Sequence, residues 1–188
     1  MTGPRFLVVA MPSLRERRAL AGELETSGLK ARLKGAMFDP ANWHQSLSDR
    51  FQVPSETERL RRACANVRAR ACTLTWNRIR CDGPHWAFRA QGKPPSFIEL
   101  VEAVKTAFAG EGLFGLKGHS PHISISYRAP PTRYTHRIRP IQWTIDEILL
   151  VKGHQMGGHE EHYGYDVIDS WRLQPARQLD LFDGPGPG

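Results

Sequence analysis

Apolar positions along this 188-residue chain follow two spacings, one typical of strands and one typical of helices. Residues 5–11 form a continuous apolar run rich in β-branched side chains, which predicts a buried central strand. Two alternating runs between residues 70 and 92 are separated by Asp82-Gly83-Pro84, so we expect a β-hairpin there. Four further strand patterns cover residues 44–49, 122–127, 141–153 and 161–173.

Helical spacing first appears after residue 12. Ser13 is a good N-cap residue and Gly28 a natural C-terminal stop, so the pattern predicts a helix between them. We expect Leu14, Leu20 and Leu24 on its inner side.

Two more helices are predicted later in the chain. Ser55 followed by Glu58 forms a capping-box signature, which opens the second. The third covers residues 95–112 and carries apolar residues at helical spacing, namely Phe97, Leu100, Val101, Val104 and Phe108.

The order of these elements is mixed, which favours an α+β sheet protein over a doubly wound one. A length of 188 residues allows one well-buried core and is short for two independent domains, so we expect one domain over residues 1–174. From Pro175 onward all periodicity is lost, and we expect residues 175–188 to be a flexible tail.

Composition is that of a soluble globular protein, with 40% hydrophobic and 24% charged residues. No run approaches the roughly 18 apolar residues that a membrane helix needs, and the first basic cluster follows the first apolar run, the reverse of a secretory signal. We therefore expect a cytoplasmic protein with no membrane partner. Cys64, Cys72 and Cys81 are odd in number and lack C-x-x-C spacing, so we expect reduced, partly buried thiols.

Charge adds one open question. Twenty-six Lys and Arg against nineteen Asp and Glu give a formal net charge of +7, and most of the basic residues are Arg, which suits phosphate oxygens. A polyanionic partner is consistent with this charge. A basic surface that only aids solubility is equally consistent.

The chain contains the pattern H-x-S-x-S twice, at residues 44–48 and 122–126. Each copy follows a helix and a glycine-containing spacer, so the two form a weak internal repeat. Alternate residues of a strand share a face, so we expect His44, Ser46 and Ser48 on one face. The second copy places its histidine and two serines, His122, Ser124 and Ser126, in the same way.

Two imidazoles facing each other across a phosphate form an acid–base pair. One takes a proton from water and the other gives a proton to the leaving oxygen. Histidine suits both roles because its pKa is ordinarily about 6.5, and serine hydroxyls can hydrogen-bond the phosphate oxygens. Taken singly, each histidine is more often a structural residue, so the hypothesis depends on their pairing.

These paired elements resemble the H-x-[S/T]-x motifs of the 2H phosphoesterase superfamily. Length and element order, from Arg5 to Leu173, are similar to its RNA 2′,3′-cyclic phosphodiesterases, also called 2′-5′ RNA ligases. The resemblance implies a bilobal fold in which two pseudo-twofold-related lobes, each an antiparallel sheet with outer helices, flank a central cleft. It also implies a monomer without metal or cofactor that opens RNA 2′,3′-cyclic phosphate ends, for example on tRNA fragments, to 2′-phosphates.

By position in the family motif, His44 matches the proton donor to the leaving 3′ oxygen and His122 matches the acceptor that activates water. Ser46 and Ser124 stand where threonine is usual. They keep the hydroxyl and lose the methyl group that restricts the rotamer.

Four further residues are candidate substrate contacts. Many relatives carry a basic residue five positions after the second histidine, where this chain has Tyr127, followed by Arg128. A shift of one residue on a strand changes the face, so a contact by Arg128 and stacking of Tyr127 on a base are alternatives. Trp43 and Trp86 flank elements expected near the cleft. Their rings either stack on a nucleobase or pack in the core, as strand aromatics usually do.

Alternative functions are left open by the sequence. The same cleft could bind a nucleotide or RNA end without turnover, or act on a small cyclic nucleotide. Ligation of 2′-5′ ends is the reverse reaction at the same site. His154, His159 and His162 lie close together in sequence, but the glycines among them fit a hairpin tip better than a metal site.

The tail carries a separate short motif, residues 178–182, in which Gln178 and Leu179 precede Asp180, Leu181 and Phe182. It resembles the pentapeptide with which many bacterial replication and repair proteins dock on the DNA sliding clamp. Leu181 and Phe182 would supply two apolar anchors and Gln178 a polar contact. The alternative is that these apolar residues fold back onto their own domain.

We predict that the isolated 14-residue tail, residues 175–188, binds a bacterial sliding clamp in a titration, and that Leu181→Ala and Phe182→Ala each weaken binding because each removes an anchor. Absence of binding at high micromolar clamp, or binding indifferent to both substitutions, would contradict the prediction.

Overall fold

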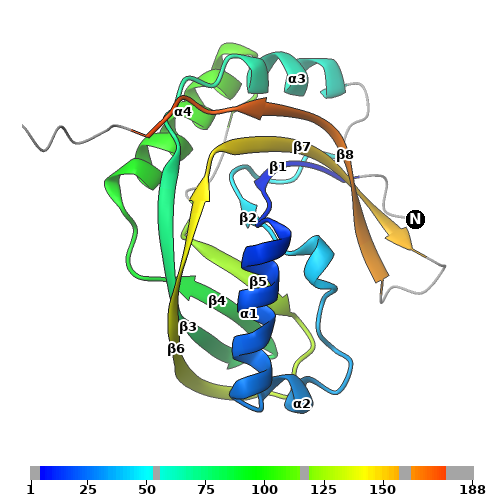
Figure 1. Ribbon diagram of the computed structural model, residues 1–188. Helices are drawn as coiled ribbons and strands as arrows, with labels where there is room; N and C mark the ends of the chain where they lie inside the picture. The colour runs from blue at the N-terminus through cyan, green and yellow to red at the C-terminus, as the bar shows by residue number, and fades with distance from the viewer. Residues whose placement is uncertain (1–4, 53–55, 115–118, 157–161, 177–188) are drawn as a thin grey trace, which may run out of the picture.

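The computed structural model describes residues 5–52, 56–114, 119–156 and 162–176. Within these residues, strands form two four-stranded antiparallel sheets with helices packed against them, which confirms the predicted α+β class (Figure 1). The first sheet has the order β2-β1-β7-β8, and the second has the order β5-β4-β3-β6. The tail motif at residues 178–182 lies outside the described residues, so clamp binding stays a prediction.

The strands of the first sheet are β1 (Arg5–Ala10), β2 (Gln45–Ser46), β7 (Glu147–Met156) and β8 (His162–Arg172). Those of the second are β3 (Cys72–Gly83), β4 (His85–Ala90), β5 (His122–Ser126) and β6 (Thr132–Ile145). The helices are α1 (Leu14–Thr26), α2 (Leu29–Leu33), α3 (Thr57–Ala65) and α4 (Pro95–Gly110), with a short 3₁₀ turn, η1, at Pro40–Asn42. None of the described helices combines the length and apolar content needed to cross a bilayer.

Helix α1 begins and ends as its sequence predicts. The Ser13 hydroxyl accepts a hydrogen bond from the backbone N–H of Arg15, and Gly28 takes the left-handed conformation at φ 69°. The expectation for Leu14 was wrong, because its side chain is 60% exposed. At 3.6 residues per turn, Leu14 lies about 120° around the helix from Leu20, away from the buried stripe.

The predicted strand at residues 141–153 is in fact parts of two strands in different sheets. Only Asp146 separates β6 from β7, so the chain passes from one sheet to the other without a loop. β6 also begins earlier than expected, at Thr132, and it includes Pro140. The β3–β6 ladder is irregular between the pairs Arg78↔Arg137 and Trp76↔Ile141, so the proline falls where no ladder donor is needed.

A second connection joins the sheets next to this crossing. The backbone N–H of Leu173, just after β8, donates to the carbonyl of Asp146, and Gln174 exchanges hydrogen bonds with Ala69 and Ala71 at the entrance to β3. The end of the first sheet is therefore joined to the beginning of the second.

Strand β1 is buried on both faces, as its continuous apolar run predicts. Phe6, Val8 and Ala10 belong to the main core, which also includes residues of the second sheet and of α1, α3 and α4. Leu7 and Val9 pack with Val151 in a smaller cluster on the opposite face. This second face is the one on which the candidate site lies.

Candidate active site

Both H-x-S-x-S motifs lie on edge strands. The first contains β2, at one edge of the first sheet, and the second forms β5, at one edge of the second sheet. β2 and β5 contact each other, so the fold brings together two segments that lie 78 residues apart. The predicted strand at residues 44–49 is only Gln45–Ser46, and His44 lies directly before it.

The two motifs have the same burial pattern. In each, the histidine and the first serine are partly exposed, while the residue after the histidine and the last two residues are buried. This equivalence is the structural form of the internal repeat. It also corrects the prediction that both serines share the face of the histidine, because the final serines, Ser48 and Ser126, are 2% and 0% exposed.

The final serines turn inward because each motif strand is irregular before its end. Leu47 and Ser48 both donate their backbone N–H to the carbonyl of Val8, and the β4–β5 register shifts just before Ser126. The Ser48 hydroxyl then accepts from the N–H of Val8 at 2.9 Å, and the Ser126 hydroxyl accepts from the N–H of Arg128 at 3.0 Å. Both hydroxyls therefore satisfy backbone donors, one buried at Val8 and one partly buried at Arg128.

Each motif histidine is held by the same bond. His44 Nδ1 lies 2.8 Å from the carbonyl oxygen of Asn42, and His122 Nδ1 lies 2.9 Å from that of Ser120, in both cases two residues earlier. A carbonyl can only accept, so Nδ1 carries the proton in both rings. In the neutral imidazole Nε2 is then left with a lone pair, which is the form of a general base.

Burial lowers the pKa of both histidines. The pKa of His44 falls to about 4, mainly by desolvation, while its bond to Asn42 opposes the shift and the charges of Arg50 and His122 add to it. Its ring also packs edge-on against Tyr165, with 4.9 Å between centroids. The pKa of His122 is lowered by burial, with the bond to Ser120 opposing and Arg89 adding. Both rings are therefore neutral at pH 7 in the free protein.

A third histidine, His85 at the start of β4, completes one side of the site and was missed by the sequence reasoning. Its Nε2 lies 3.2 Å from Ser124 Oγ, which donates to the hydroxyl of Tyr127 at 3.1 Å. The ring centroid of His85 lies 6.2 Å from that of His122. His85 directly follows the β3–β4 turn, and its place beside Ser124 depends on strand pairing that the sequence does not specify.

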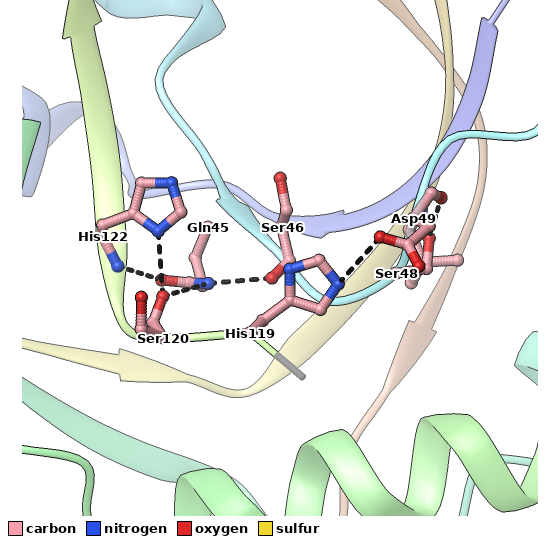
Figure 2. Close-up of polar contacts among 8 residues, drawn as sticks. Gln45, Ser46, Ser48, Asp49, His119, Ser120 and His122 are labelled. Atoms are coloured by element: carbon pink, nitrogen blue, oxygen red, sulfur yellow. Dashed lines mark hydrogen bonds and ion pairs between the residues drawn. The ribbon is translucent and has the colours of Figure 1, made fainter. Parts of the chain in front are cut away.

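A cavity of about 310 Å³ opens beside His122. Its lining includes Ser46 and a fourth histidine, His119, whose Nε2 lies 3.8 Å from a carboxylate oxygen of Asp49 (Figure 2). Leu7, Ser48 and Arg50 complete the wall. His119 was not predicted either. Its pKa is lowered, first by burial, and the charge of Asp49 acts in the opposite direction.

The four predicted substrate contacts separate into two groups. Tyr127 is 49% exposed, and its ring lies against Phe38 and His85 beside Ser124; Arg128 is also exposed. Trp43 and Trp86 are 1% and 0% exposed, so the prediction that they stack on a base was wrong. Both rings pack in the core, against Phe88 and against Tyr134 with Arg32, respectively.

All three cysteines are free and buried, as expected. Among the described residues, no group of three or more His, Cys, Asp or Glu side chains is arranged to hold a metal ion. His154 pairs with Asp166 at 3.1 Å, and His159 lies outside the described residues.

The arrangement of the two sheets is shared with solved structures. Escherichia coli LigT in its apo form aligns with a TM-score of 0.70 at 15% identity, covering 93% of this chain and 99% of LigT. A structure named only as a phosphoesterase gives 0.70 at 15% identity, over 92% of this chain and 99% of its own. TT0787 of Thermus thermophilus gives 0.68 at 16% identity, over 92% and 100%. LigT has also been crystallised with 3′-AMP.

No protein-family model and no curated protein matches the chain by sequence. The bilobal fold predicted from the paired motifs is nevertheless confirmed, since the alignment extends over nearly the whole of each chain.

The depressed pKa of His44 predicts a pH-dependent stability. An unfolded histidine titrates near about 6.5, so between that pH and about 4 the unfolded state binds more protons than the folded state. The contribution of neutral His44 to the free energy of unfolding is therefore complete above the pKa of the unfolded histidine, and it is lost as pH falls toward 4. In urea unfolding, the free energy of wild type relative to His44→Asn, which cannot titrate, should fall by on the order of 2–3 kcal/mol across this range. Parallel pH curves for the two proteins would refute this.

The final serines of the two motifs should contribute more to stability than Ser46 does. Ser48→Ala and Ser126→Ala should each lower the free energy of unfolding by about 1–3 kcal/mol, because each leaves a backbone N–H without its acceptor. Ser46→Ala is the matched control and should change it by less than about 0.5 kcal/mol, since Ser46 is partly exposed and its hydroxyl accepts from no backbone N–H of the described residues. Equal losses for Ser46 and Ser48 would show that the final serines have no special structural role.

Proposed function

We propose that this protein is a metal-independent phosphodiesterase of the 2H phosphoesterase superfamily that opens RNA 2′,3′-cyclic phosphate ends to 2′-phosphates. One observation carries the proposal: the motifs of two contacting edge strands each hold an imidazole whose Nδ1 is bonded to the carbonyl two residues earlier, so that both Nε2 atoms are left to exchange protons. The fold supports it, because LigT shares this architecture and binds 3′-AMP, a ribonucleotide with a 3′-phosphate.

In the proposed reaction, His122 Nε2 accepts a proton from a water molecule as the water oxygen attacks phosphorus. The bond between phosphorus and the 3′ oxygen breaks, and His44 Nε2 donates a proton to that oxygen. The product has a free 3′ hydroxyl and a 2′-phosphate. Proton transfer back between the histidines through solvent restores the starting state.

The donor role requires a protonated His44, whereas burial keeps this ring neutral in the free protein. A bound cyclic phosphate carries one negative charge, and an opposite charge within a few ångströms favours the protonated imidazole. We therefore infer that substrate and proton enter the site together. The same burial makes His44 a strong acid once it is protonated.

The hydroxyls are suited to the phosphate oxygens. Ser46 lines the cavity beside His122, and Ser124 lies between His85 and Tyr127. These groups can donate to the oxygens on which charge accumulates in the transition state. Tyr127 then contacts Ser124 through its hydroxyl, and its half-exposed ring is available to a base.

The net charge of +7 favours RNA over a small nucleotide as substrate, because a longer chain of phosphates gains more from a basic surface. A small cyclic nucleotide is the second candidate, and the cavity of about 310 Å³ is in keeping with it. Binding of an RNA end without turnover is the third.

The proposal predicts cleavage of an oligonucleotide ending in a 2′,3′-cyclic phosphate in the presence of EDTA, with the product phosphate mapped to the 2′ oxygen. His44→Ala and His122→Ala should each lower turnover by at least about 100-fold, as expected for acid–base partners. His136→Ala, a substitution on β6, is the matched control and should leave turnover unchanged.

Other outcomes identify the alternatives. Faster turnover of a mononucleotide cyclic phosphate than of the oligonucleotide would favour the small substrate. Binding without product would favour the binding module, and wild-type turnover in either motif variant would refute the histidine mechanism.

A further inference from the structure

Gln45, the residue between the two reactive positions of the first motif, reaches across the cleft to the second motif. Its backbone pairs with Ala10 in the first sheet, and its side chain, 0% exposed, ends at the start of β5 in the second. Oε1 accepts from the backbone N–H of His122 at 2.7 Å. Nε2 donates to the carbonyls of Ser46 and Ser120, at 2.8 Å and 3.4 Å (Figure 2).

The orientation of this amide is determined by its partners. A backbone N–H can only donate and the two carbonyls can only accept, so the oxygen must face His122 and the nitrogen must face Ser46 and Ser120. A side chain with the same shape but without both a donor and an acceptor cannot make this set of bonds. Burial makes each lost bond costly, because water does not replace it.

Gln45 acts on the two atoms that locate the second imidazole. The Ser120 carbonyl accepts from both Gln45 Nε2 and His122 Nδ1, and the N–H that Gln45 binds belongs to His122 itself. The equivalent residue of the second motif, Ile123, is an apolar core residue and makes no reciprocal bridge. The sequence alone predicted no role for Gln45, because alternation along a strand places its side chain on the face opposite the histidine.

We propose that Gln45 is a positioning residue that aligns His122 with the first motif, so that the two Nε2 atoms face the same phosphate. This inference rests on the proposed function. The effect of Gln45 on the orientation and tautomer of His122 can be measured without substrate. A displacement of about 1 Å at a proton-transferring group costs on the order of 100-fold in rate, so such a bridge has a large effect on turnover.

Two variants separate the contacts. Gln45→Met keeps the length of the side chain and removes all three hydrogen bonds. Gln45→Glu keeps an acceptor for the His122 N–H but has no donor for the Ser120 carbonyl, and its carboxylate brings a negative charge close to His122. Ser48→Ala is the matched control, because it also removes a buried hydrogen bond of the first motif, and the Ser48 hydroxyl bonds the backbone of Val8 and Asp49, not the second motif.

The first readout is the tautomer of each histidine, measured by ¹⁵N NMR in the full chain without substrate. In wild type and Ser48→Ala, His44 and His122 should both show the Nδ1–H form. In Gln45→Met, His122 should become a mixture of tautomers while His44 is unchanged. An unaltered His122 signal in Gln45→Met would overturn the proposal. Should Gln45→Met not fold, Gln45→Glu takes its place, with a higher titration midpoint for His122 as the expected result.

The second readout is turnover of the cyclic phosphate. Gln45→Met should lose on the order of 100-fold in kcat with little change in KM, because the phosphate contacts are kept and the alignment is lost. In Gln45→Glu the limb of the pH profile that reports His122 should move to higher pH. A loss in Gln45→Met no larger than in Ser48→Ala would overturn the proposal. If wild type shows no turnover but the His122 tautomer changes in Gln45→Met, the proposed function is refuted and the positioning role of Gln45 stands.

Discussion

A single type of hydrogen bond, from imidazole Nδ1 to the carbonyl two residues earlier, determines what this site can do. Because the acceptor lies only two residues earlier in the chain, each ring is anchored locally, and at His122 the Gln45 side chain also holds that acceptor. The bond leaves Nε2 as the reactive atom in both rings. The contact between β2 and β5 brings the two motifs that carry these rings together.

The fold was largely readable from the sequence because its elements are bounded by local signals. Ser13, Gly28 and the Gly83-Pro84 turn mark element ends through their own backbone preferences, and the structure has ends there. The passage at Asp146 carries no such signal, since neither glycine nor a loop interrupts the apolar pattern. A change of sheet within a continuous strand is decided by tertiary packing, which periodicity does not report.

The site was readable only where it repeats. His44 and His122 could be paired because their motifs are alike, whereas His85 and His119 come from unrelated contexts and meet the motifs only through strand pairing and loop placement. Trp43 and Trp86, by contrast, were predicted as site residues and are core residues. Both flank elements expected near the cleft, which suggested exposure, but each ring points into the core.

The absence of a spacer between β6 and β7 has a mechanical consequence. Domains that close on a ligand need a flexible joint, and here the described chain passes from one sheet to the other through one residue, Asp146, whose carbonyl is itself bonded to Leu173. Since one continuous core also spans both sheets, a rotation of one sheet against the other would disturb packing that they share. Opening the two sheets at this crossing would therefore cost both the Leu173–Asp146 hydrogen bond and part of the shared core.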